Sequence, residues 1–155
     1  MGARSALEWV TFLADRAPEH CTLARLKRVY ALTMTTQTRA QFTPILLTIM
    51  SSHPERLRQT AWLEFTLLAG QFCANQSELN ALGGLLRMHI TDEALPSLQA
   101  IATDASLEHH RLQPIAQAIL DERAQQRARL LLQQAGSLSL SQHEGGELTQ
   151  QDKQD

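Results

Sequence analysis

The sequence has few of the residues that usually carry chemistry or cross-links. Of its 155 residues only 5% are aromatic and two are cysteines. Two cysteines without C-x-x-C spacing exclude a disulfide scaffold and a cysteine-rich zinc site, so we expect Cys21 and Cys73 to be small buried hydrophobes. The scarcity of aromatics also argues against a stacking platform for single-stranded nucleic acid.

Motifs with a known catalytic mechanism are missing as well. The sequence contains no G-x-S-x-G, G-x-G-x-x-G, P-loop or H-E-x-x-H pattern. Its one histidine cluster is His109-His110, and neighbouring helical residues diverge by about 100°, so both rings do not readily share a metal. The same divergence separates His20 from Cys21. We therefore expect no metal, no cofactor and no enzyme.

Long apolar runs are also lacking. Glu8 and Asp15 interrupt the apolar residues near the N-terminus, which leaves no core for a signal peptide. No stretch approaches the roughly 20 apolar residues of a membrane span. Hydrophobic residues nevertheless make up 43% of the chain, enough for one globular domain with a core. We expect a cytoplasmic protein without a membrane span.

What the sequence does have is a series of helix starts, each followed by leucine-rich helical pattern. They are Ser5-Ala6-Leu7-Glu8, Thr43-Pro44, His53-Pro54, Ser77-Glu78, Thr91-Asp92-Glu93 and Asp104-Ala105-Ser106. Capping residues and apolar repeats at this spacing predict helices, and no strand-type alternation intervenes. The pattern predicts an all-α fold, a compact orthogonal bundle of six or seven helices over residues 4–135. A short irregular helical-repeat solenoid is the alternative.

The expected boundaries follow from the same signals. The predicted helices cover about 5–16, 19–34, 54–74, 92–102 and 106–135, with Pro114 dividing or kinking the last one. A further helix is expected after Thr43-Pro44, with apolar residues as far as Met50, and another after the Ser77 cap. We expect a Ser5–Glu8 capping box, and a threonine-rich connection over 33–43. Gly83-Gly84 predicts a close approach by a neighbouring helix, with a kink as second choice.

The end of the chain has its own composition. Gly136 is a typical helix stop, and residues 136–155 are acidic and rich in glutamine. This segment has too little apolar surface to offset the entropy of ordering it, so we predict a disordered tail. Four acids against one lysine give residues 137–155 a net charge of −3, which leaves +1 for the body out of the chain's −2.

Basic residues gather in one part of the body. No acidic residue occurs between Glu19 and Glu55, and twelve of the fourteen basic residues of the chain are arginines, whose guanidinium binds carboxylate or phosphate as a planar fork. Two segments therefore supply the candidate contact residues: Arg25, Lys27, Arg28, Arg39, Arg56 and Arg58 in the first, and Arg123, Arg127 and Arg129 in the second.

These observations favour a non-enzymatic protein–protein interaction module, an adaptor or small subunit of a larger bacterial-type assembly. Its partner is expected to be another protein, and surplus leucines in the last helix point to a homo-oligomer as a further form of association. The alternative is a nucleic-acid-binding accessory subunit that uses a basic face of residues 20–58. An enzyme is the least favoured class.

Overall fold

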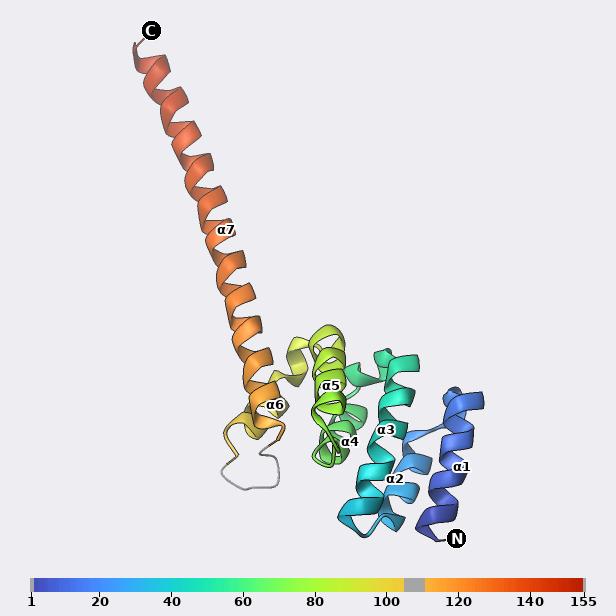
Figure 1. Cartoon of the computed structure of the whole chain (residues 1–155). Helices are drawn as coiled ribbons and strands as arrows, with labels where there is room; N and C mark the ends of the chain where they lie inside the picture. Colours follow the sequence, from blue (N-terminus) through green and yellow to red (C-terminus); the bar gives the residue numbers. More distant parts are fainter. Residues whose placement is uncertain (1, 105–110, 155) are drawn as a thin grey trace. The chain divides into compact units, whose positions relative to one another are not determined.

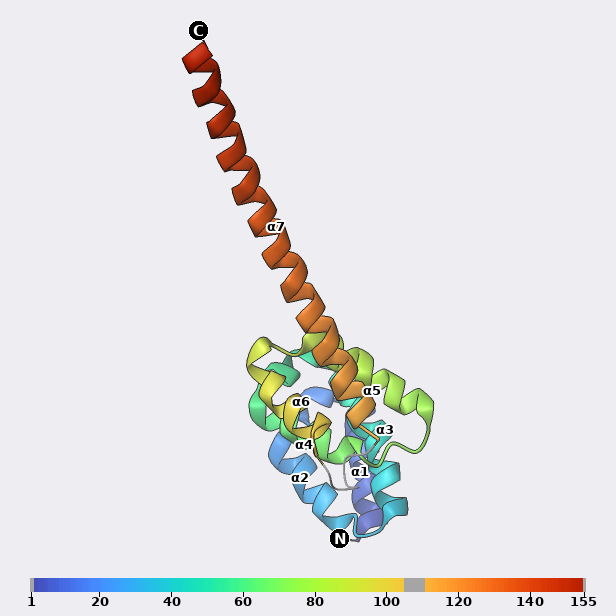
Figure 2. The same cartoon turned by 90° about the vertical axis from the view of Figure 1, so that its left-hand side faces the viewer.

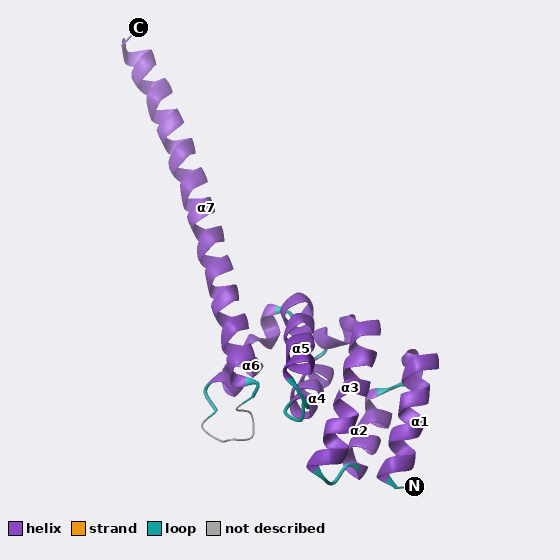
Figure 3. Cartoon of the chain, viewed as in Figure 1, coloured by secondary structure: helices purple, strands orange, loops and turns teal. Residues whose placement is uncertain are grey.

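The computed structural model describes residues 2–104 and 111–154, with side chains as far as residue 137, and over these residues it shows helices and loops but no strand (Figure 3). The order is α1 (Ala3–Arg16), η1 (Pro18–His20), α2 (Leu23–Leu32), α3 (Thr36–Ser52), η2 (Pro54–Arg58), α4 (Thr60–Gly70), α5 (Gln76–His89), η3 (Asp92–Ala94), α6 (Leu95–Ala102) and α7 (Gln113–Gln154), where η marks a 3-10 helix. The predicted all-α fold is confirmed.

The chain divides into two units, Met1–Gln117 and Ala118–Asp155, and each is described by itself. The single domain expected over residues 4–135 stays a prediction. In the first unit α1, α3 and α5 lie side by side (Figure 1), and α2, α4 and α6 lie on one side of them (Figure 2). Because α3 contacts α1, α4, α5 and η2, it is the centre of the bundle.

Three aromatic side chains join α2, α3 and α4. Tyr30, Phe42 and Phe65 meet edge to face, with ring centroids 5.5–5.9 Å apart. Each such pair contributes about 0.5–1.5 kcal/mol beyond the area it buries. The buried hydroxyl of Thr43 lies 3.1 Å from the Arg39 carbonyl and 3.2 Å from the Ala69 carbonyl, which links α3 to α4. These contacts tie α2 and α4 to α3.

The first helix begins earlier than its sequence signal. The predicted capping box of Ser5 and Glu8 is wrong, because α1 starts at Ala3 with Gly2 as N-cap and both residues lie inside the helix. Glu8 instead accepts a hydrogen bond from Arg4 at 3.4 Å. The second helix is shorter than the predicted 19–34, since residues 18–20 form η1 and Thr22 caps α2.

The threonine-rich connection predicted over 33–43 is also wrong. Thr35 and Thr38 form a reciprocal capping box, so α3 starts at Thr36 and runs to Ser52. A threonine side chain can hydrogen-bond to nearby backbone groups. Inside a helix these bonds compete with the helical ones, whereas at a helix start they satisfy N–H groups that have no other partner. Pro44 therefore lies inside α3 instead of at its first turn, where we expected it.

The long helix predicted over 54–74 is two elements. Gln59, with extended backbone, separates η2 from α4. The prediction that Ser77 caps the next helix is wrong. The N-cap of α5 is Asn75, whose side chain accepts a hydrogen bond from the Glu78 N–H at 2.9 Å. The close approach is at Gly70: a Cβ there would lie 2.6 Å from Cδ2 of Leu82.

The Gly83-Gly84 pair does not have the role that its sequence suggested. A Cβ at Gly83 would make an ordinary contact with Ile115 at 3.4 Å, and one at Gly84 would meet nothing within 4 Å. The helix α5 continues through both residues without interruption. Glycine at these two positions is therefore not required by a close backbone approach.

The last helix, α7, begins at Gln113, so Pro114 occupies its first turn. The predicted start at residue 106 falls outside the described residues.

The predicted stop at Gly136 is wrong: α7 continues through it, because a stop of this type needs a positive φ, and no described glycine has one. The tail predicted over 136–155 lies, from residue 138 on, beyond the residues whose side chains are described. None of the helices in the described residues is long and apolar enough for a membrane span.

Candidate functional site

Two of the predicted contact arginines converge on the turn around η1. One guanidinium nitrogen of Arg56 donates to the Cys21 carbonyl at 2.8 Å and the other to the Glu19 carbonyl at 3.4 Å. The same guanidinium lies over the Trp62 ring, 4.6 Å from its centroid. Arg25 donates to the His20 carbonyl at 2.8 Å. Both side chains thus satisfy backbone carbonyls that no helix hydrogen bond covers.

Arg39 has the same kind of role at the next connection. Its Nε donates to the Thr33 carbonyl at 3.0 Å, just after the end of α2. Its guanidinium carbon lies 5.2 Å from the Tyr30 ring centroid and 5.0 Å from that of Phe72. Arg111, outside the predicted set, likewise donates to the Cys73 carbonyl. Four arginines of the first unit, Arg25, Arg39, Arg56 and Arg111, therefore connect to backbone carbonyls at helix ends and loops.

The other basic residues of the first segment do not form one patch. Lys27 and Arg28 are exposed on α2, but Lys27 and Arg25 are two residues apart and so point about 160° from one another on the helix. Arg58 is exposed on η2, where it borders a small recess that Glu93 also lines. The structure therefore does not gather the basic residues of 20–58 into one continuous phosphate-binding face.

The second predicted set lies on α7. Arg127 and Arg129 are exposed and Arg123 is half-buried. Arg123 and Arg127 are four residues apart and share one side, whereas Arg129 points to nearly the opposite side. Of these three arginines, two thus form a pair on one side of α7 and the third lies on another side.

Three consecutive leucines follow these arginines and are exposed. The exposed fractions are 58% for Leu130, 60% for Leu131 and 72% for Leu132. Consecutive helical side chains diverge by about 100°, so the three leucines spread over roughly 200° of the surface of α7. Two further exposed apolar side chains, Trp9 at 40% and Phe12 at 57%, lie on α1, where the Arg16 guanidinium carbon is 4.8 Å from the Phe12 centroid.

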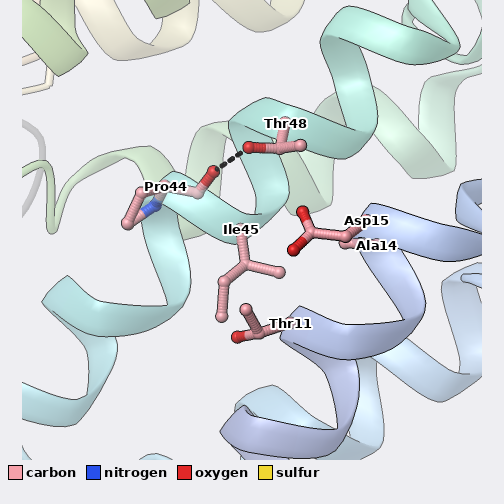
Figure 4. A pocket seen from close by; sticks show the side chains of 6 residues that line it. All are labelled: Thr11, Ala14, Asp15, Pro44, Ile45 and Thr48. Carbon is pink, nitrogen blue, oxygen red and sulfur yellow. Dashed lines mark hydrogen bonds between the residues drawn. The ribbon is translucent and has the colours of Figure 1, made fainter.

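A groove lies between the facing sides of α1 and α3. Its volume is about 270 Å³, and it is lined by Thr11, Ala14, Asp15, Pro44, Ile45 and Thr48. The Asp15 carboxylate points from α1 toward α3, and Ile45 lies between the two helices (Figure 4). This volume is just below the roughly 300–1,000 Å³ of small-molecule sites, so the groove fits a side chain better than a cofactor.

The two cysteines are poor nucleophiles. Cys21 and Cys73 are buried and free. Burial raises the pKa of Cys73 from its ordinary 9.0 to about 11, and burial is also the main cause that raises the pKa of Cys21. The thiolate is the reactive form, so neither is activated. The described residues include no group of three histidine, cysteine or acidic side chains that could hold a metal ion, and the His109-His110 cluster lies outside them.

Sequence reasoning missed both the groove and the exposed aromatics. The aromatics had a signal, because Trp9 and Phe12 are three residues apart and lie off the apolar stripe of α1. The groove had no sequence signal, because it forms only where the packing of two helices brings Asp15 and Thr48 together. Comparison of the chain with models of known protein families, with curated proteins and with solved structures found no match.

Proposed function

We propose that this protein is a non-enzymatic interaction module, an adaptor or small subunit that binds another protein through α7. The observation that carries the proposal is the run Leu130–Leu132, which exposes 58–72% of each side chain. Contiguous exposed apolar surface is uncommon on monomeric proteins unless it meets a partner. A cytoplasmic site of action and membership of a bacterial-type assembly belong to the same proposal.

The surface of α7 also suits a helical partner. Leu131 belongs to a stripe that repeats every three or four residues and has apolar members only: Leu120, Ala124, Ala128, Leu131 and Ala135. At 100° per residue these five positions stay within about 80° of one another, and the 4-4-3-4 spacing matches the helical period closely. Alanines let a second helix approach closely, and the leucines supply apolar area for it to bury.

The test replaces the three leucines together by glutamine and captures partners from native lysate with wild type and variant. Exchanging Gln133 and Gln134 for alanine on the same helix is the control, because it changes side chains without removing apolar area. We expect wild type and control to retain a protein partner after nuclease treatment and the leucine variant to lose it, with unchanged helix content by circular dichroism. Equal capture by all three forms contradicts the proposal.

Sedimentation velocity distinguishes association with a second copy of this chain from association with a different protein. A wild-type species larger than the monomer that returns to monomer in the leucine variant identifies the partner as a second copy of this chain. Binding that disappears with nuclease in every form favours the alternative function instead.

The alternative is a nucleic-acid-binding accessory subunit that uses the basic residues of 20–58. Exposed Arg25, Lys27 and Arg28 on α2 support it. Arg39 and Arg56 weaken it, since both guanidinium groups are engaged with backbone carbonyls and aromatic rings. Phosphate binding falls steeply with salt, so a mobility shift at about 50 mM salt that disappears by about 200 mM supports this alternative, and no shift at the lower salt removes it.

A further inference from the structure

The groove between α1 and α3 presents side-chain hydrogen-bond acceptors without donors. The Thr11 hydroxyl donates its proton to the Leu7 carbonyl at 2.6 Å, and the Thr48 hydroxyl donates to the Pro44 carbonyl at 2.9 Å (Figure 4). A hydroxyl has one proton, so both oxygens offer the groove only lone pairs. An ionised aspartate also only accepts, and Pro44 has no N–H to give.

The charge of the groove is negative and uncompensated. Asp15 makes no hydrogen bond or ion pair with any of the described residues, and the neighbouring Arg16 stacks on Phe12 instead. Asp15 lies in the last turn of α1, where the carbonyl end of the helix dipole is already negative. Both sources of negative potential attract a cation.

The walls of the groove are apolar. Ala14, Pro44 and Ile45 line it beside the polar atoms. The matching ligand is therefore a cation with several donors and an apolar stem. An arginine side chain has this form, since its methylene stem packs on apolar surface while its planar guanidinium offers five donors and is weakly hydrated.

We propose that this groove receives an arginine side chain of the protein partner, with the guanidinium on Asp15 and the stem along Pro44 and Ile45. The inference rests on the proposed interaction role, because it names a chemical feature of that partner. It adds a second contact, on the first unit of the chain, to the one proposed for α7.

The test uses a blocked tripeptide, acetyl-Gly-Arg-Gly-amide, titrated into the isotopically labelled full chain and followed by amide shifts in NMR. We expect saturable shifts confined to residues 11–15 and 44–48, with a dissociation constant of roughly millimolar size for one anchoring side chain. The same tripeptide with citrulline, which keeps the length and planarity but lacks the charge, should bind more weakly.

Two variants complete the design. Asp15→Asn keeps the shape of the groove and removes its charge, and we expect it to weaken arginine binding by about 1.5-fold to fivefold, the range of an exposed ion pair. Glu64→Gln removes an exposed carboxylate on α4, outside the groove, and should leave binding unchanged.

Three results would overturn the inference: no shifts in the groove, equal binding of the arginine and citrulline peptides, or equal weakening by both variants. The peptide needs no partner, so this outcome is independent of the leucine experiment on α7. If the peptide does not bind the groove while the wild type still captures its partner, only the inference is refuted. If partner capture does not depend on the leucines, the proposed role is refuted.

Discussion

Arg56 offers the sharpest test of whether the arginines hold the fold together or face a partner. The change is Arg56→Met, which keeps most of the apolar stem over Trp62 and removes the guanidinium. The buried Cys21 then loses the donor to its carbonyl at 2.8 Å, and the Glu19 carbonyl loses a weaker one at 3.4 Å. We expect the free energy of unfolding to fall.

The size of the effect follows from these contacts. A hydrogen bond from a charged donor contributes about 1.5–3 kcal/mol, and a guanidinium over an aromatic ring adds about 0.5–1 kcal/mol at exposed sites. Arg56 is only half-buried, so water replaces part of the loss, and we expect about 2 kcal/mol. An unfolding entropy of about 2.1 cal/mol/K per residue over the first unit, Met1–Gln117, converts this into a fall in Tm of about 8 °C.

The assay is thermal and urea unfolding followed by circular dichroism and tryptophan fluorescence. Arg58→Met is the matched control, because it makes the same exchange in the same 3-10 helix at an exposed position, where substitutions stay within about 0.5 kcal/mol. Equal shifts for the two variants would refute the reasoning, since the guanidinium of Arg56 would then contribute no more than a surface charge.

Two further predictions concern packing and pH. Gly70→Ala places a Cβ 2.6 Å from Leu82, which is fully buried and has no room to retreat, so we expect a loss of about 1–3 kcal/mol in urea unfolding. Gly84→Ala meets nothing within 4 Å inside α5 and should stabilise by about 0.5–1 kcal/mol; the opposite order of the two variants contradicts the packing. Because burial raises the pKa of Cys73 from 9.0 to about 11, its contribution to stability is full below pH 9 and is lost as the pH rises through 11. The urea midpoint of wild type should therefore fall more over this interval than that of Cys73→Ala, and parallel curves would show that the thiol is not responsible.

Helix signals in the sequence were reliable where they depended on local chemistry and unreliable where two local uses competed. Pro18 ended α1 as predicted, because a proline cannot continue the hydrogen-bond ladder. Threonines such as Thr35 and Thr38 have low helix propensity, but as a capping box these two start α3. Gly136 is typical of a helix stop, yet α7 passes through it, since glycine also adopts ordinary helical angles.

The candidate sites were less predictable than the fold. Sequence identified the arginine bias, but the partners of Arg39 and Arg56 are carbonyls and rings 6 to 37 residues away. Nothing in the order of residues distinguishes an arginine that donates hydrogen bonds to loop carbonyls from one that is free to bind a phosphate. The surplus leucines of the last helix indicate an association surface, and the structure exposes Leu130–Leu132, because three adjacent helical residues cannot all face one core.

By itself the sequence determined that this chain is helical, since apolar spacing, caps and prolines act over a few residues and leave no strand pattern to compete. Only the tertiary structure decided which side chains make contacts within the protein and which remain available to a partner. It committed Arg39 and Arg56 to backbone carbonyls, and it brought Asp15 and Thr48 into one groove from helices that lie 33 residues apart in sequence at these positions. Hydrogen bonds and charges act through space, and the distances between them are set by how helices pack.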